Sequence, residues 1–165
     1  MPDPIVTPAI RGFEAVQEAH PQNVAVLALQ ELAIDAKFDR DELTVTVARE
    51  NIVAAAKAVQ SAGYNFFETV TAVDWYPNEP RFVLAYHIVS HSLKQRIRLA
   101  VRLSGEDAVV DSITDVWPSA NFYEREVFDL FGIHFGGHPN LTRIMMPVDW
   151  KGHPLRKDYP VEGYR

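Results

Sequence analysis

Apolar and polar positions alternate along several short segments of the chain. Residues 43–47 alternate apolar side chains with threonine, and residues 96–103 alternate them mainly with arginine. Such a period of two predicts strands with one buried face. Residues 66–75 predict another strand, and the continuous apolar run 82–89 predicts a central strand that is buried on both faces. Residues 36–38 precede the first of these segments and predict its hairpin partner.

Three further segments have the spacing of amphipathic helices. Residues 23–32 place apolar side chains on one stripe, with Asn23 as the predicted cap. Residues 52–62 are rich in alanine and stop at Gly63, which is typical of a helix end. Residues 123–131 repeat apolar side chains at intervals of four, seven and eight, which predicts a helix with one buried stripe.

The predicted order of elements favours an α+β fold. Hairpins dominate, so we expect a mixed, largely antiparallel sheet with helices packed on one face. Residues 23–135 would form this globular domain. Residues 1–22 are dotted with prolines and are expected to be loosely structured. Residues 136–165 have no regular period and are expected to form an extended, proline-rich C-terminal tail.

The tail is too apolar for a flexible linker. Four prolines and three glycines between residues 136 and 160 exclude a helix or an inner strand. Large apolar side chains nevertheless accumulate in and just before it, and as a group they would be costly to leave in water: Phe135, Leu141, Ile144, Met145, Met146, Trp150, Leu155 and Tyr159. This composition predicts a segment that lies along its own domain or along another subunit.

Charge and cysteine content exclude several functions. The net charge is −6, from 16 basic and 22 acidic side chains, so the chain lacks the basic surface that nucleic acid requires. It contains no cysteine. It therefore offers no disulfide, no thiolate zinc site and no ligand set for an iron–sulfur cluster. If the chain belongs to an electron-transfer assembly, other subunits must hold the redox groups.

The helix at 123–131 carries charges with two interpretations. Arg125 and Asp129 are four residues apart and could pair, whereas Glu126 and Asp129 could form a carboxylate pair for proton transfer. Asn121 and Glu124 also predict a weak capping box. The alternative, which we favour, is that the acids of the helix hold basic side chains of the tail, namely Arg143, Arg156 and Lys157.

The histidines of the tail allow a metal-site hypothesis. His134, His138 and His153, together with Asp149, supply the number of groups that zinc requires, which would suit a small metal-dependent hydrolase. Glycine and proline around His138 make a metal-binding helix unfavourable there. We favour turns at the two His–Pro steps, with each imidazole bonded to nearby backbone. We therefore predict no metal ligand in this chain.

Two observations concern the predicted sheet. Arg96, Arg98 and Arg102 form a basic stripe on one strand face, which we interpret as a solvated face in preference to a docking surface. His87, within the apolar run, is expected to be a core histidine with satisfied hydrogen bonds. We find no phosphate-binding glycine loop, nucleophile elbow or metalloprotease motif.

The motifs around the tail resemble a known family. The sequence reads ERE at 124–126, DLFGI at 129–133, GHP at 137–139, and DWKGHPLRKDYP at 149–160. With VTAVDW at 70–75, this pattern resembles the C subunit of the bacterial respiratory NADH:quinone oxidoreductase, complex I. The resemblance implies a signature that is structural or partner-binding and not catalytic: Glu124, Arg125, Glu126, Asp129, Gly132, His138, Pro139, Arg143, Trp150, His153, Pro154, Arg156, Lys157 and Tyr159.

The resemblance also implies a role. Members of this family carry no cofactor and support assembly of the peripheral arm of a proton-translocating NADH:quinone oxidoreductase. Flavin and iron–sulfur clusters would lie in partner subunits. The expected neighbours are the quinone-site subunit and the terminal-cluster subunit, and the expected location is peripheral, at the cytoplasmic face of the bacterial inner membrane, with membrane contact only through partners. The equivalent subunit of a related membrane-bound hydrogenase or of a dehydrogenase with another donor is the alternative.

Overall fold

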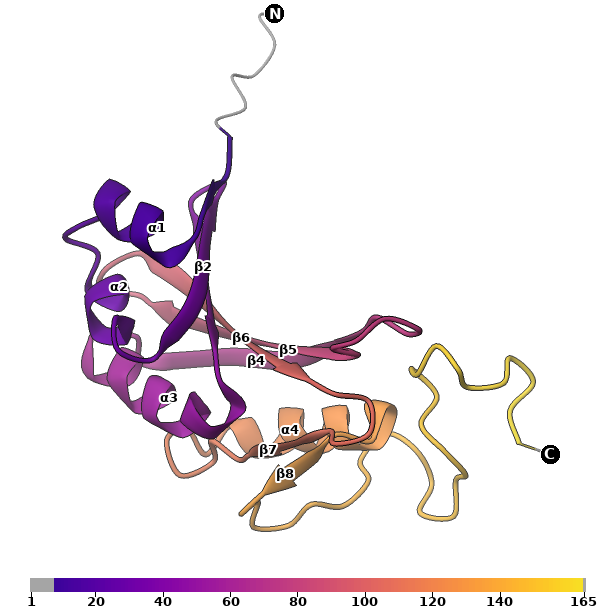
Figure 1. Ribbon diagram of the computed structural model, residues 1–165. Helices are drawn as coiled ribbons and strands as arrows, with labels where there is room; N and C mark the ends of the chain where they lie inside the picture. The colour runs from indigo at the N-terminus through magenta and orange to yellow at the C-terminus, as the bar shows by residue number, and fades with distance from the viewer. Residues whose placement is uncertain (1–7, 165) are drawn as a thin grey trace, which may run out of the picture.

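A six-stranded sheet organises the chain. The computed structural model describes residues 8–164, and the strand order of the main sheet is β1-β2-β3-β6-β5-β4 (Figure 1). The elements are β1 (Ile10–Arg11), α1 (Phe13–Ala19), α2 (Val24–Leu29), β2 (Ala33–Asp39), β3 (Glu42–Val47), a 3-10 turn (Arg49–Asn51), α3 (Ile52–Ser61), β4 (Phe66–Asp74), β5 (Phe82–Ser90), β6 (Gln95–Leu103), β7 (Val109–Asp111), α4 (Ala120–Phe131) and β8 (His134–Gly136).

The sheet is mixed and mostly antiparallel. Only β3 and β6 run parallel within it, with Val45 opposite Leu99, and the other neighbours are antiparallel. A separate parallel pair joins β7 to β8. The parallel step exists because α3 and the β4–β5 hairpin intervene between β3 and β6, and a parallel connection needs such a crossover. The predicted α+β fold with a mixed, largely antiparallel sheet is confirmed.

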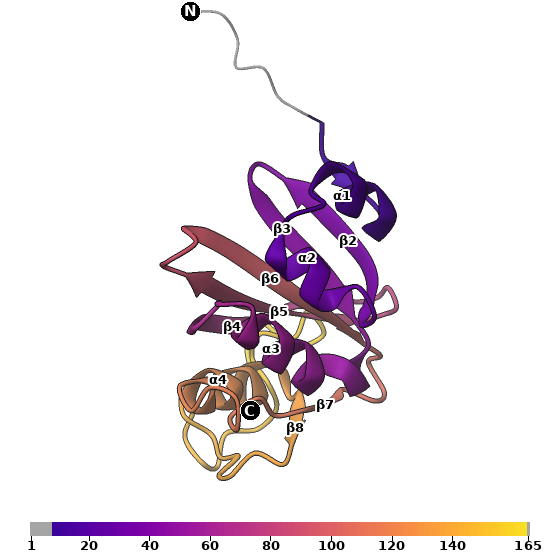
Figure 2. The same ribbon diagram turned by 90° about the vertical axis from the view of Figure 1, so that its left-hand side faces the viewer.

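The core lies between the sheet and its helices. Helices α1, α2 and α3 lie on the same side of the sheet, and α4 packs against β4 (Figures 1 and 2). Helix α3 buries Ile52, Ala55, Ala56 and Val59, and its alanines permit a close approach to the strands. Strand β6 turns Ile97 and its apolar neighbours at every second position into the same core.

Some expectations differ from the structure near the N-terminus and in β5. Residues 10–19, expected to be loose, form β1 and α1, and Val16 is fully buried. Strand β5 is an inner strand, but its burial alternates, so it is not covered on both faces. His87 consequently lies on the open face of the sheet and is half-buried, so the core-histidine expectation was wrong. Residues 1–7 lie outside the described part of the chain.

The chain leaves the domain after β8. Between Gly137 and Tyr164 the structure contains turns and bends but no helix or strand. This segment, which we call the tail, passes the C-terminal end of α4 and continues beyond the β4–β5 end of the sheet (Figure 1). The prolines and glycines of the sequence account for the absence of regular structure in it.

Candidate functional site

The first anchor of the tail is a buried carboxylate on α4. The Asp129 side chain is fully buried, and its oxygens accept hydrogen bonds from the backbone amides of Ile144, Met145 and Met146 at 2.7–2.9 Å. Arg143 donates to the same carboxylate at 2.6 Å. Burial alone would raise the Asp129 pKa, but these donors outweigh it and lower the pKa. Asp129 therefore remains ionised and fixes the root of the tail.

Two arginines complete this anchor through backbone carbonyls. Arg125 donates to the carbonyls of Thr142 and Arg143 at 3.0 and 3.1 Å. Arg143 also donates to the carbonyl of Gly152 at 3.0 Å, which draws a later part of the tail toward α4. The pairing of Arg125 with Asp129 that the helical spacing allowed is not formed. The tail supplies the partner of Asp129 instead.

The C-terminal end of α4 forms a second anchor. Gly132 adopts a left-handed conformation with φ of 72°, and an added Cβ would lie 2.6 Å from the His153 ring. His153 Nδ1 lies 2.9 Å from the carbonyl of Asp129, and Arg156 donates to the carbonyl of Phe131. The last carbonyls of a helix have no partner within the helix. Here the tail supplies those partners, and only glycine allows it to approach so closely.

A buried acid on the other side of α4 supports the start of the tail. Glu124 is fully buried, accepting from the Ser112 hydroxyl at 2.6 Å and from the Ile113 amide at 2.8 Å. The predicted capping box was therefore wrong, because Glu124 contacts the segment before the helix. Burial raises the pKa of Glu124 to about 7, although its two donors oppose the shift. His138 Nε2 lies 3.9 Å from Glu124 Oε2.

His138 closes the turn at the first His–Pro step. Its Nδ1 accepts from the Asn140 amide at 3.0 Å, so its Nε2 carries the proton and donates to the Asn121 carbonyl at 3.2 Å. Burial lowers the pKa of His138, and burial likewise lowers the pKa of His153. Both rings are thus held neutral and bonded to backbone.

A third anchor joins the tail to the sheet. Arg81 donates to Asp74 at the end of β4 and to Asp158 in the tail, at distances of 2.6–3.0 Å. The Lys157 amide donates to Asp74 at 2.8 Å. Burial would raise the Asp74 pKa, but Arg81 and the amides of Lys157 and Tyr76 lower it to about 2. The guanidinium of Arg156 lies 5.4 Å from the centroid of the Phe82 ring.

The remaining signature residues have smaller contacts. The Glu126 side chain is exposed and forms no hydrogen bond or ion pair with residues 8–164, and the Asp129 carboxylate is bonded to Arg143 instead. Pro139 is exposed and Pro154 is half-buried. The Tyr159 hydroxyl donates to the Lys151 carbonyl at 3.3 Å. Trp150 is 41% exposed and donates its amide to Pro147.

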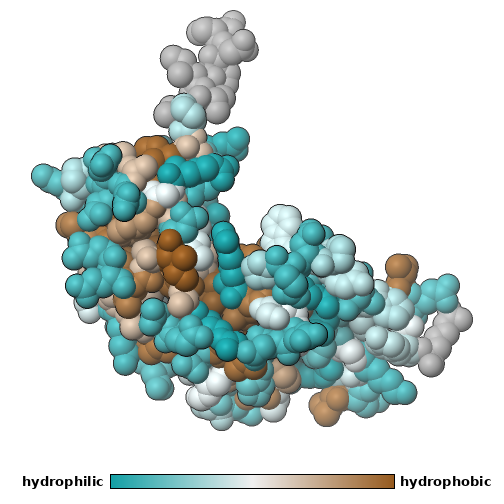
Figure 3. Space-filling model, viewed as in Figure 1, coloured by the Kyte–Doolittle hydropathy of each residue, from teal (hydrophilic) through white to brown (hydrophobic). Residues whose placement is uncertain are grey.

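The far side of the tail presents apolar side chains outward. Its exposed large residues include Met145 at 57% and Val148 at 93% of full exposure. The complete set comprises Ile144, Met145, Val148, Trp150, Leu155, Val161 and Tyr164. Figure 3 shows hydrophobic groups protruding where the tail lies. An anchored segment with so many exposed apolar side chains is typical of a protein-binding surface.

The metal-site hypothesis finds no support in the geometry. Residues 8–164 contain no group of three or more histidine, aspartate or glutamate side chains positioned to hold a metal. His138 and His153 bond backbone carbonyls on different parts of α4, and His134 is exposed. In the described part of the chain, none of the helices has the length and apolar character that crossing a bilayer requires.

Sequence reasoning did not find several members of this site. Asp74, Arg81 and Asp158 form its best-connected ion-pair network, yet Arg81 and Asp158 are 77 positions apart. The DW at 74–75 and the KD at 157–158 both lie within the family motifs. That co-occurrence was the available signal, but nothing in the spacing joins them. Ser112, which holds Glu124, had no signal beyond its small polar side chain.

The structure defines a class of protein: an α+β domain whose C-terminal segment, without helix or strand from Gly137 to Tyr164, is held to the domain by the ion pairs of Asp129 and Arg81. A family model described as respiratory-chain NADH dehydrogenase, 30 kDa subunit, matches residues 45–165. The chain belongs to this family, which comprises the C subunits of NADH-quinone oxidoreductase, respiratory complex I. It is thus a component of that complex, as the sequence motifs indicated.

Individual relatives agree with this assignment. The chain is 48% identical over 146 residues to the NADH-quinone oxidoreductase C subunit of Citrifermentans bemidjiense, covering 86% of this chain and 91% of the relative. It is 46% identical over 147 residues to the same subunit of Geobacter sulfurreducens, with the same coverage. The C subunit of Rhodobacter capsulatus is 47% identical over 134 residues, covering 79% of this chain and 67% of the relative.

Two solved structures share the fold. One is described as Nqo5 in its trypsin-resistant fragment 1–134, with 36% identity and a TM-score of 0.57 over 61% of this chain and 83% of that chain. The other is a chain of the membrane-bound sulfane sulfur reductase, an archaeal respiratory membrane complex. It is 26% identical, with a TM-score of 0.67 over 82% of each chain.

Proposed function

We propose that this chain is a cofactor-free structural and assembly subunit in the peripheral arm of proton-translocating NADH:quinone oxidoreductase. In this role the sheet domain is a platform, and residues 136–165 are a docking arm for neighbouring subunits. The single observation that carries the proposal is the two-sided tail. Its inner side is fixed by Asp129, Gly132 and Arg81, while its outer side exposes apolar side chains.

The anchors favour binding energetically. An arm that is ordered before binding avoids much of the entropy cost that a disordered segment would incur on docking. The exposed Met145, Trp150 and Tyr164 belong to residue types that are enriched at protein interfaces. The occupants that suit the family are the quinone-site subunit and the terminal-cluster subunit, between which electrons would pass to quinone.

The absence of cysteine is consistent with a structural role for this chain and with redox groups that are bound by other subunits. With no thiolate in the chain, any iron–sulfur cluster must be ligated elsewhere in the complex. We infer that attachment to the cytoplasmic face of the inner membrane occurs through partners. Relatives named as NADH-quinone oxidoreductase at 46–48% identity favour NADH as the donor of the complex.

The proposal is tested by removing only the outward apolar groups. The triple variant Met145→Ser, Val148→Ser and Trp150→Ser leaves the side chains of Asp129 and Arg81 untouched. We expect it to reduce recovery of the chain in purified complex by about tenfold or more, because buried interface anchors carry most of the binding free energy.

A matched control variant replaces exposed apolar residues that lie outside the tail. Ile34 and Phe122 are 65% and 62% exposed, and the double variant Ile34→Ser and Phe122→Ser should leave recovery unchanged. Equal recovery of the tail variant and the control, with both folded by circular dichroism, would contradict the docking role of the tail.

A further inference from the structure

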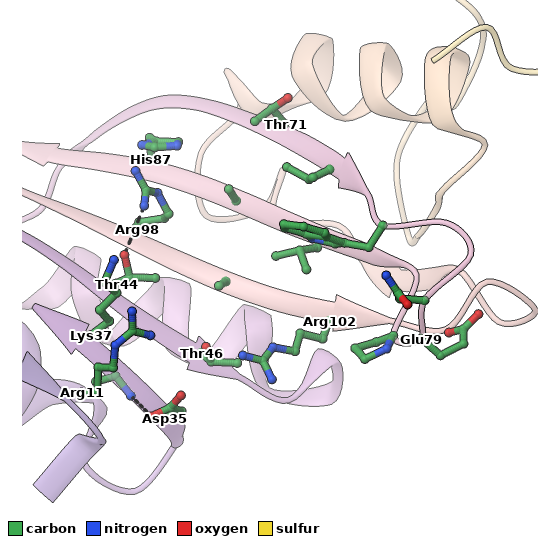
Figure 4. Close-up of a pocket in the computed structure, with 18 residues that line it drawn as sticks. Arg11, Asp35, Lys37, Thr44, Thr46, Thr71, Glu79, His87, Arg98 and Arg102 are labelled. Atoms are coloured by element: carbon green, nitrogen blue, oxygen red, sulfur yellow. Dashed lines mark hydrogen bonds between the residues drawn. The ribbon is translucent and has the colours of Figure 1, made fainter. Parts of the chain in front are cut away.

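The face of the sheet away from the helices contains a hollow that the tail does not occupy. It has a volume of about 680 Å³ and is lined by side chains of β1 to β6 and of the β4–β5 loop. Figure 3 shows it as a depression between the two limbs of the curved sheet, and Figure 4 shows its lining. The basic stripe of β6 that the sequence revealed faces this hollow, through Arg98 and Arg102.

The floor of the hollow is built from short side chains. Thr46, Thr71, Ala85 and Ala100 come from four different strands and line it together. Such a surface lets another polypeptide backbone approach the sheet closely. At the rim, Trp75 is 51% exposed and offers an apolar contact. The volume is sufficient for several residues of an extended segment.

Two guanidinium groups in the hollow form no hydrogen bond or ion pair with residues 8–164. They belong to Arg11 and Arg102. Arg11 lies near enough to Asp39 to lower the pKa of that carboxyl, but Asp39 is bonded to Lys37. By contrast, Arg98 is paired with Glu42 at 2.6 Å, and Lys37 is paired with Asp39 at 2.6 Å. Arg40 is also without such a bond, but it lies at the β2–β3 turn outside this hollow. The two free guanidiniums are therefore the groups available to a ligand here.

The acids of the lining do not neutralise these arginines. Glu79 accepts the backbone amides of Arg81 and Gly105, which hold its carboxylate at the β4–β5 loop. Asp35 accepts the amide of its neighbour Ala36. An isolated arginine fork binds a carboxylate with two donors. The hollow is lined by four basic and two acidic side chains, so its lining is positive on a chain whose net charge is −6, which favours an acidic ligand there.

We propose that the open face of the sheet is a second docking surface, which receives an extended, acidic segment of a neighbouring subunit of the same complex. Carboxylates of that segment pair with Arg11 and Arg102, its backbone lies over the short side chains of the floor, and an apolar residue contacts Trp75. The surface is separate from the tail, and the inference depends on membership of the complex but not on the role of the tail.

The test places a photoreactive benzoylphenylalanine at Val73, on the rim of the hollow, in the purified intact complex. The matched probe at Lys57 lies exposed on α3, on the helical side of the sheet. We expect light to join the Val73 probe to an acidic stretch of another subunit, identified by mass spectrometry. The Lys57 probe should give no such adduct. An adduct only to a second copy of this chain, an adduct to a segment without acidic residues, or no adduct would overturn the proposal.

Charge reversal gives an independent readout that does not depend on the probe. The double variant Arg11→Glu and Arg102→Glu should reduce the Val73 adduct roughly threefold to tenfold, and the complex should lose this chain at lower salt. Lys57→Glu is the control and should have no effect. Salt retention equal to that of the unsubstituted chain would overturn the proposal. If the tail variants are lost from the complex and the unsubstituted chain still gives the Val73 adduct, both docking surfaces are supported. If the tail variants are retained and the adduct still forms, only the role of the tail is contradicted.

Discussion

Glu124 is a buried acid whose ionisation is coupled to the stability of the fold. Its side chain is buried, and burial raises its pKa to about 7, above the ordinary value of 4.5. The groups that face it are neutral: His138 from the tail has a lowered pKa, and Tyr86 from β5 has a raised pKa through burial and through Glu124 itself. The Ser112 hydroxyl and the Ile113 amide donate to Glu124 and favour the carboxylate, but the effect of burial on the pKa is larger and favours the neutral acid.

This residue makes a pH-dependent prediction. Because the folded pKa is raised, the stability that Glu124 contributes is fully present below pH 4.5 and is lost as pH rises through about 7. Glu124→Gln should therefore match the unsubstituted chain near pH 4 and be more stable by roughly 2–4 kcal/mol near pH 9. Urea unfolding across this pH range is the measurement. The exposed Glu126→Gln is the control, and parallel pH profiles for the Glu124 variant and the unsubstituted chain would contradict the account.

Alanine substitutions at Gly132 and Gly137 separate two contributions to the free energy of unfolding, namely the contact with the tail and the left-handed backbone conformation. Gly132 and Gly137 have similar φ values of 72° and 75°, but a Cβ at Gly137 would meet nothing within 4 Å. Gly137→Ala should cost about 1 kcal/mol for the left-handed backbone. Gly132→Ala should cost about 2–4 kcal/mol, since His153 and Arg156 must also move. Thermal unfolding of both variants provides the comparison. Equal losses of stability would show that His153 does not pack closely against the end of α4.

Among the secondary-structure elements, helix α4 binds the start of the tail mainly through Asp129. Asp129→Asn keeps the size of the side chain but removes the charge that binds Arg143 and three backbone amides. Breaking a buried charged contact of this kind costs about 2–3 kcal/mol. The tail root should therefore open more often, and trypsin should cut after Arg143 and Lys151 roughly 30-fold to 100-fold faster. Glu126→Gln is the control on the same helix, and unchanged cleavage in the Asp129 variant would contradict the anchor.

The sequence predicted helices and strands correctly where hydrophobic residues repeat at a regular spacing within one segment. The alternation at 43–47 and 96–103 identified β3 and β6, and the apolar stripe of 123–131 identified α4. Helix α1 was missed because the prolines before it and its charged, short stripe resemble a loose terminus. The burial of His87 was misjudged because an apolar run does not show that one sheet face stays open.

The local spacing of hydrophobic residues cannot predict contacts between segments that are far apart in the sequence. The acids of α4 were correctly associated with basic tail residues in the case of Arg143 and Asp129. The partner of Glu124 and the network of Arg81 depend on how the β4–β5 end of the sheet meets the tail. Family motifs include Glu124, Asp74 and Asp158 but not Arg81, and only the fold shows which of these residues contact one another.

At the scale of the whole molecule, the chain has two outward surfaces on one platform. Helices cover one face of the sheet, the hollow with Arg11 and Arg102 occupies the other, and the tail projects at the β4–β5 end (Figure 1). A protein with surfaces in different directions can join several neighbours without binding any cofactor of its own. The separate locations predict that variants of the tail and of the hollow have additive effects on retention in the complex.

The central claim is that the tail docks on a partner while its root is held by α4. Hydrogen exchange of the backbone amides between residues 147 and 164 tests it directly, measured in the free chain and in the purified NADH-quinone oxidoreductase complex. We predict that these amides exchange at least about tenfold more slowly in the complex, whereas the amides of Ile144 to Met146, already bonded to Asp129, change little. Equal exchange of residues 147–164 in the two states would show that the tail has no partner and would contradict the account.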